Sequence, residues 1–154
     1  MAATVEAILE EAGYPLPEPP PKLGNYVGAV TVGNVVYVSG HAPWEGQELL
    51  TGKLGREVSI EQGQHAARVV ILNCLASLKA EIEDLSRVKR IVKLLGMVNC
   101  TDDFVETPAV IDGASDLLVQ VFGDKGQHAR SAVGFASLPK GISVEIEVIV
   151  ELHT

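Results

Sequence analysis

The C-terminal segment alternates apolar and polar side chains over eleven positions, and no other feature constrains the fold as strongly. Its apolar members are Ile142, Val144, Ile146, Val148, Val150 and Leu152, and between them stand Ser143, Glu145, Glu147, Ile149 and Glu151. Successive side chains of a strand point to opposite faces, so this period predicts a strand with one face in a core. The fold must therefore contain a sheet that is covered on one side.

Four further segments are predicted to supply strands. Residues 26–32 and 35–39 are rich in β-formers and are separated by Gly33-Asn34, which predicts a hairpin. Residues 89–99 predict another strand. Residues 130–138 lead through Pro139-Lys140-Gly141 into the last strand, and we expect this turn to close a second hairpin.

Two helices are expected between these strands. Ser59 and Gln62 have the spacing of a capping box and open a predicted helix that runs to about Glu83 with one apolar face. Thr107 as N-cap and Pro108 after it predict a second helix to Phe122. The order strand–strand–helix–strand–helix–strand–strand predicts an α+β fold, with two helices on one face of a mixed sheet.

The N-terminal region has a different character. Thr4 to Ala12 predict a short helix that stops at Gly13, and Pro15 to Pro21 predict a stiff, extended linker. At 154 residues the chain has room for one core. We therefore expect an N-terminal extension over residues 1–22 and a single domain over residues 23–154. Residues 40–57 contain four glycines and no period, which predicts a long, functional loop.

Composition argues against several classes of protein. The net charge is −8 and aromatic residues make up 5% of the chain, so a polyanion is repelled and bases find few stacking surfaces. The basic cluster at residues 87–93 is interpreted as a solvated strand face. We therefore expect no nucleic-acid partner. Apolar runs are too short to cross a membrane, and no signal peptide is recognisable, so a cytoplasmic location is expected.

The cysteine pattern offers no metal site. Cys74 and Cys100 stand alone, without the paired spacing of zinc or redox motifs, and are expected to be reduced, buried thiols. His41 and His65 lack partners at ligand spacing. We expect no metal and no cofactor.

The uncovered face of the predicted sheet suggests self-association. Ala132, Gly134 and Ala136 are assigned to that face on one strand, and Glu145 and Glu147 on the other. A second copy of the chain would cover it.

Arg130 is the candidate centre of a site. A guanidinium presents a planar fork that matches a carboxylate, and Ser131 and Ala132 leave room beside it for a small acid. A structural ion pair between Arg130 and Glu145 is the alternative. His128 is interpreted either as an exposed loop residue or as a proton carrier. Ser39 precedes Gly40-His41, but no nucleophile elbow surrounds it, which argues against a serine hydrolase.

Residues 129–146, with the sequence ARSAVGFASLPKGISVEI, resemble the C-terminal signature of the Rid/YjgF family of enamine/imine deaminases, also called endoribonuclease L-PSP. Asn25-Tyr26-Val27 and Val38-Ser39-Gly40-His41 are similar to its N-terminal landmarks. The resemblance extends from Leu23 to Leu152. It is that of a divergent branch, because Ala132 replaces a common cysteine, His128 precedes Ala129-Arg130, and the region 104–123 is long.

The resemblance implies a chorismate-mutase-like (bacillus-type) two-layer fold and a homotrimer with clefts between subunits. It implies hydrolysis of 2-imino or enamino acids to 2-keto acids and ammonia. By the resemblance, Arg130 would hold the substrate carboxylate with help from the backbone N–H of Ala132, and Glu145 would orient water. Tyr26 and Ser39 would line the cleft, and His128 is added to the substrate-binding residues. The alternatives are a non-catalytic trimer that binds a small carboxylate and, less favoured, an endoribonuclease.

The predicted second hairpin creates a geometric problem. It would pair residues whose numbers sum to about 280, and Arg130 and Glu145 would then lie on opposite faces of the sheet. We therefore expect a bulge, a strand that starts after Arg130, or donation of the two residues by two subunits.

Overall fold

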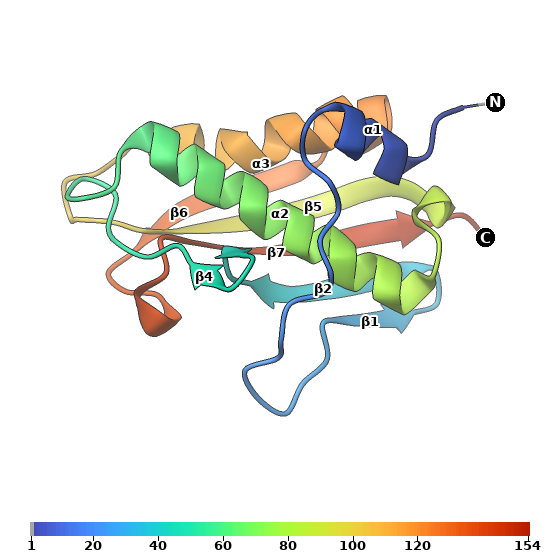
Figure 1. Ribbon diagram of the computed structural model, residues 1–154, viewed down its shortest axis with the longest axis horizontal. Coiled ribbons are helices and arrows are strands. Elements are labelled where there is room, and N and C mark those ends of the chain that lie inside the picture. Colours follow the sequence, from blue (N-terminus) through green and yellow to red (C-terminus); the bar gives the residue numbers. More distant parts are fainter. Residues whose placement is uncertain (1) are drawn as a thin grey trace.

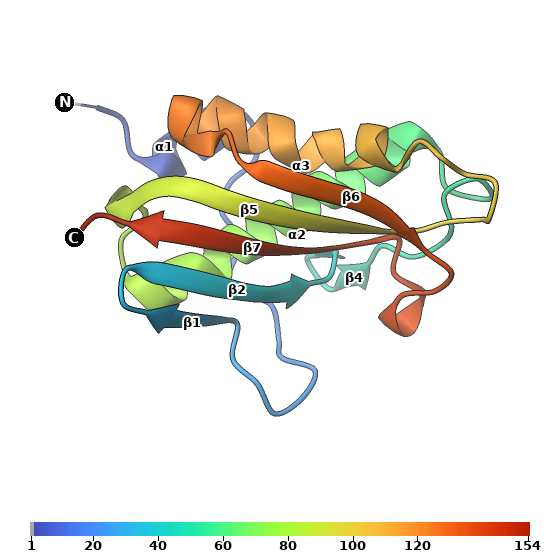
Figure 2. The same cartoon turned by 180° about the vertical axis from the view of Figure 1, so that it is seen from behind.

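The computed structural model describes residues 2–154 as two layers, a mixed sheet and the helices that cover one of its faces (Figure 1). The sheet order is β1-β2-β7-β5-β6. The bounds of these strands are β1 Ala29–Val32, β2 Val35–His41, β5 Val88–Asn99, β6 Ala129–Phe135 and β7 Val144–Leu152. Helices α2 (Ile60–Ile82) and α3 (Thr107–Phe122) cover one face, and the other face carries no helix (Figure 2). The predicted α+β class is confirmed.

Strand β7 lies at the centre of the sheet, as its alternating sequence requires. The apolar residues at even positions from 144 to 152 are buried beneath the helices, and the odd positions face the uncovered side. The first hairpin is also confirmed, with Val32 opposite Val35 across Gly33-Asn34. Gly33 has φ of +62°, a conformation that glycine adopts without strain.

The second hairpin is a wrong prediction. Strand β6 pairs with β5 in parallel, so that Arg130 lies beside Leu94, and β5 separates β6 from β7. A parallel pair needs a crossover, which here is the α3 segment. The turn Pro139–Gly141 (η3) is a short 3₁₀ segment that carries the chain past β5 to β7.

The orientation of β6 corrects a second prediction. Ala132 and Gly134 face the helices and not the uncovered side: a Cβ on Gly134 would lie 2.7 Å from the sulfur of Cys100. The residues of β6 on the uncovered side are Ser131, Val133 and Phe135. Small side chains at 132 and 134 are explained by the close approach of β6 to the segment before α3, where the Thr107 hydroxyl donates to the Ala132 carbonyl.

Helix boundaries follow the predicted signals closely. The capping box at Ser59 and Gln62 is formed in both directions. The N-cap position of α3 is Glu106, one residue before the predicted Thr107, and its side chain makes no capping hydrogen bond. Pro108 occupies the first turn. Gly113 lies where α3 meets α2, because a Cβ there would come within 2.2 Å of the Gln64 carbonyl oxygen.

The N-terminal helix α1 (Val5–Glu11) is capped by Thr4 and packs on the helical layer. Leu9 is fully buried, and Glu6 pairs with Lys79 of α2 at 2.9 Å. The proline-rich linker then crosses α2 toward the open end of β2 (Figure 1). The predicted loop 40–57 contains a small hairpin of β3 (Trp44–Glu45) and β4 (Glu48–Leu49). The remaining short segments are η1 (Leu85–Arg87) and η2 (Gly123–Gly126).

Candidate functional site

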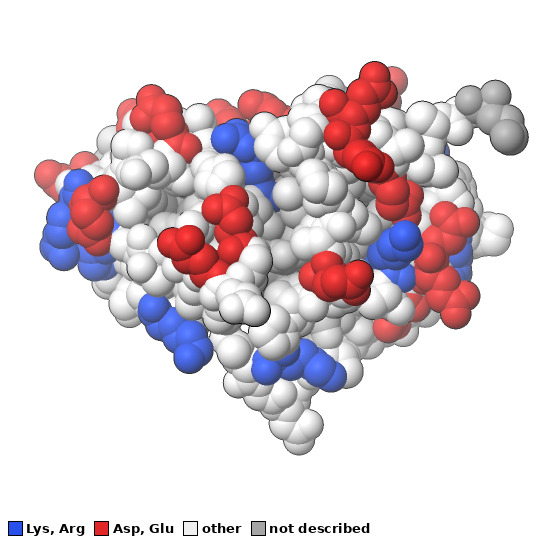
Figure 3. Space-filling view, in the orientation of Figure 1, with Lys and Arg blue, Asp and Glu red and all other residues white. Residues whose placement is uncertain are grey.

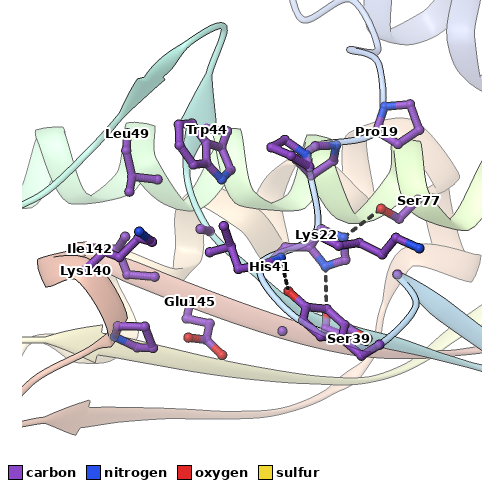
Figure 4. A pocket seen from close by; sticks show the side chains of 18 of the residues that line it. Pro19, Lys22, Ser39, His41, Trp44, Leu49, Ser77, Lys140, Ile142 and Glu145 are labelled. Atoms are coloured by element: carbon purple, nitrogen blue, oxygen red, sulfur yellow. Dashed lines mark hydrogen bonds between the residues drawn. The ribbon is translucent and has the colours of Figure 1, made fainter.

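A pocket of about 560 Å³ opens at the end of β2. Its walls come from the linker at residues 19–23, the ends of β2 and β7, one face of α2 and the η3 turn (Figure 4). Glu145, Ser39 and Tyr26 all line it. Three residues predicted for the site are therefore brought together, although 106 positions separate Ser39 from Glu145 in the sequence.

Glu145 reaches this pocket through a local irregularity of the sheet. The pairing of β2 with β7 shifts between Val38 and His41, and Gly40 stands in the shifted segment. A Cβ at Gly40 would meet the Glu145 carboxyl, so a side chain at position 40 would force that carboxyl to move. Burial raises the pKa of Glu145 above its usual range, and the charge of Glu147 raises it further.

Ser39 and Tyr26 are held by backbone contacts. The Ser39 hydroxyl donates to the carbonyl of Val27 at 2.7 Å, and the Tyr26 hydroxyl oxygen accepts the Leu23 N–H at 3.3 Å. The first bond ties the segment before β1 to β2, and the second lies within that segment. The two hydroxyl groups belong to one wall of the pocket.

Arg130 lies elsewhere, on the edge strand β6 and on the helix side of the sheet. Its Nη1 donates to Oδ1 of Asp112 at 2.7 Å and to Oγ of Ser115 at 3.2 Å, both on α3. The alternative of an ion pair between Arg130 and Glu145 is therefore wrong within one chain, because the partner is Asp112. Strand β6 starts before Arg130, and the register shifts of the sheet lie in the pairings of β2 with β7 and of β5 with β7. Neither a late strand start nor a bulge therefore brings the two residues together.

His128 and Ala132 lie beside Arg130. His128 Nε2 contacts Ser115 Oγ at 2.9 Å, and its Nδ1 contacts the Gly126 carbonyl at 2.6 Å. His128 is half-buried, so its interpretation as an exposed loop residue is wrong. The predicted residues thus form two groups: Glu145, Ser39 and Tyr26 in the pocket, and Arg130, His128 and Ala132 on the far edge.

Sequence reasoning missed one part of the pocket. His41 and Ser77 are both buried there, with Nε2 of His41 2.7 Å from Oγ of Ser77. His41 was considered only as a metal ligand or as the partner of Ser39. Ser77 lies 36 residues away on α2, within the buried face, and nothing in its local sequence distinguishes it.

Both thiols are buried, as predicted, and burial raises the pKa of Cys74 and of Cys100. No group of three His, Cys, Asp or Glu residues in the range 2–154 is placed to hold a metal ion. Across the same range no helix has the length and apolar character required to span a membrane.

Comparison with known proteins agrees with this architecture. The family model described as "YjgF/chorismate mutase-like, putative endoribonuclease" matches residues 6–152. The chain belongs to this family. Protein TCP17 of Trypanosoma cruzi is 42% identical over 97% of this chain and 94% of its own length.

Two further similarities bear on the site and on the fold. The 2-iminobutanoate/2-iminopropanoate deaminase of Dermatophagoides farinae is 32% identical over 89% of this chain and 93% of its own length. The crystal structure of Atu1372 from Agrobacterium tumefaciens, a protein of unknown function, is 44% identical, with a TM-score of 0.91 over 98% of this chain and 93% of that one. The YjgF/chorismate-mutase-like fold predicted from the signature is thereby confirmed.

Proposed function

We propose that the protein hydrolyses 2-imino or enamino acids to 2-keto acids and ammonia. The observation that carries this proposal is the half-buried Glu145 carboxyl, which lines a pocket with Ser39 and Tyr26. Membership of the YjgF family and similarity to a protein named as a 2-imino acid deaminase support it.

The second part of the proposal is that two copies of the chain complete each site. Within one chain, β7 and β5 lie between β2 and β6, so Arg130 stands apart from the Glu145 pocket. In a homotrimer, the β6 edge of one copy would present Arg130 and the Ala132 N–H to the pocket of its neighbour. The uncovered sheet face, where Val133 and Phe135 are exposed, offers an apolar surface for such contact.

The reaction requires few catalytic groups. An iminium carbon is already electrophilic, so the chain must hold the substrate and orient one water molecule. Nη1 of Arg130 is engaged by Asp112 and Ser115, which leaves its other N–H groups to bind a carboxylate. Glu145 would accept a proton from the attacking water or from the tetrahedral intermediate.

A coupled assay tests this function. An amino-acid oxidase generates 2-imino acids, semicarbazide traps those that survive, and active protein lowers the trapping. We expect Glu145→Gln to reduce kcat by about 10²-fold or more. Glu147→Gln, two positions along the same strand, serves as the control and should keep most activity. Trapping that is unchanged by the wild-type protein across several amino acids would contradict the proposal.

A non-catalytic carboxylate-binding role is the second candidate. The pairing of Arg130 with Asp112 partly neutralises the cation before any ligand arrives, and Ala132 stands where deaminases commonly have a cysteine. Calorimetric titration with 2-keto acids separates the two functions. Binding at micromolar concentration without accelerated loss of imine would select the non-catalytic role.

An endoribonuclease is the least favoured candidate. Acidic side chains are spread over the helix-covered face, and basic ones do not form a continuous surface on it (Figure 3). The net charge of −8 opposes RNA binding as well. Cleavage of labelled RNA that is unaffected by Arg130→Ala would identify a contaminant.

A further inference from the structure

The pocket contains a second acid–base pair besides Glu145. His41 extends from the end of β2 toward α2, where its Nε2 lies 2.7 Å from Oγ of Ser77. Its Nδ1 lies 2.5 Å from the carbonyl oxygen of Ser39. Both contacts are drawn in Figure 4, with Glu145 on the side of the pocket away from Ser77.

The partners of His41 determine its tautomer. A carbonyl oxygen only accepts, so Nδ1 carries the proton that is donated to Ser39. The other ring nitrogen of the neutral imidazole is then an acceptor, and the Ser77 hydroxyl donates to it. These two hydrogen bonds direct the proton of the Ser77 hydroxyl toward a base, Nε2 of His41.

Gly28 packs directly against this pair. A Cβ built on Gly28 would lie 2.9 Å from Oγ of Ser77 and 3.9 Å from Nε2 of His41, so a side chain at this position would displace the hydroxyl. Gly28, His41 and Ser77 all line the pocket, so a water molecule or a substrate nitrogen in the pocket could reach Ser77.

The surroundings keep His41 neutral. Burial lowers the pKa of His41, and the bond to the Ser39 carbonyl opposes this only in part. The other titratable groups that line the pocket are Glu145 from β7, Lys22 and Tyr26 from the segment before β1, and Lys140 from η3. None of these forms a hydrogen bond or ion pair with His41 in the part of the chain that the structure describes.

We propose that Ser77 and His41, which both line the pocket, form a proton relay to its interior. The relay itself is a geometric inference, and its role in imine hydrolysis rests on the function proposed above. As water attacks the iminium carbon, one of its protons passes to Ser77 while the Ser77 proton passes to Nε2 of His41. The carbon–oxygen bond forms, and the electron pair of the carbon–nitrogen double bond moves to nitrogen.

The same relay then runs in reverse. The imidazolium returns a proton through Ser77 to the amino group of the carbinolamine. The carbon–nitrogen bond breaks, ammonia leaves, and the Glu145 carboxylate takes the hydroxyl proton as the keto group forms. Glu145 and the relay therefore serve the two proton transfers from opposite sides of the pocket, with no additional reagent.

Kinetics of three variants test the relay. Ser77→Ala removes the hydroxyl, His41→Gln removes the base, and Gly28→Ala presses a methyl group against Oγ of Ser77 while keeping both side chains. We expect each to lower kcat by about 10²-fold with little change in KM. The wild-type pH profile should have an acid limb, in which kcat falls as His41 becomes protonated, and this contribution of His41 should vanish in His41→Gln.

A matched control separates the relay from a packing role. His65→Gln removes a histidine of α2 that lies outside the pair and contacts Glu45 at 2.6 Å. This variant should leave the pH profile unchanged. If Ser77→Ala keeps kcat within about twofold of wild type and keeps the acid limb, the relay is overturned.

A labelling experiment distinguishes failure of the relay from failure of the proposed function. Ser77 held by His41 should attack a small fluorophosphonate: Oγ bonds to phosphorus, fluoride leaves, and the proton passes to His41. Mass spectrometry should find the adduct on Ser77 in the wild type and not in His41→Gln or Gly28→Ala. In a protein inactive on every imine, this adduct still supports the relay, and its absence overturns it.

Discussion

Glu145 illustrates how a single residue of the site opposes stability. Burial and Glu147 raise its pKa, so the folded chain binds this proton more tightly than the unfolded chain does. The resulting stabilisation is complete at pH values below the unfolded pKa of Glu145 and is lost as the pH rises through the folded pKa. At neutral pH the ionised Glu145 carboxylate therefore lowers the free energy of unfolding.

Replacement of this residue should separate stability from activity. We expect Glu145→Gln to unfold at a temperature about 2 °C higher than wild type at pH 8, because the amide has no charge to desolvate. The difference should shrink as the pH falls toward about 4, where the wild-type carboxyl is protonated. Differential scanning calorimetry at both pH values measures it. A destabilised variant at pH 8 would show that the carboxylate is stabilised by the fold.

The site residues that could be located from the sequence share one property: the pattern of the residues beside them identifies their place in a strand. Glu145 stands in the alternating strand and Ser39 at the end of another, so both could be predicted. The partnership of His41 with Ser77 could not, because it joins β2 to α2 across 36 positions. Its local trace is Gly28, whose backbone lies so close to Ser77 that a Cβ would come within 2.9 Å of Oγ.

At the scale of elements, local pattern predicted the strands but not their neighbours. Residues 129–135 have the same period of two whether they pair in a hairpin or in parallel, so the turn at Pro139–Gly141 suggested the wrong partner. Gly113 disfavours a helix interior when its segment is considered alone. In the structure it is the position at which α3 meets the backbone of α2, a contact between elements that no single segment reveals.

Helix α1 matters to the site because it anchors the linker that forms one wall of the pocket. Leu9 is its fully buried contact, whereas Glu10 beside it is exposed. We expect Leu9→Ala to cost about 2–4 kcal/mol of unfolding free energy and Glu10→Ala less than about 0.5 kcal/mol. Urea denaturation measures both. An equal, small effect of the two changes would mean that α1 contributes little to the fold.

At the scale of the whole molecule, the uncovered sheet face and the divided site point to one arrangement. Val30 and Tyr37 are exposed at one end of that face, and Val133 and Phe135 at the other. The assembly proposed above would cover these apolar side chains. The same assembly that covers these residues would bring the Arg130 of one copy to the pocket of the next.

Mixing two inactive variants tests whether each site draws on two chains. Arg130→Ala keeps Glu145, and Glu145→Gln keeps Arg130. A site is therefore complete only where the Glu145 pocket of an Arg130→Ala chain meets the Arg130 of a Glu145→Gln chain. Random assembly of equal amounts of unfolded and refolded chains makes about one site in four complete, and about a quarter of the wild-type activity should return. Sites built within one chain would regain none, because every chain would lack one of the two groups. Refolding each variant alone supplies the control, and sedimentation of the mixture confirms that the chains have reassembled.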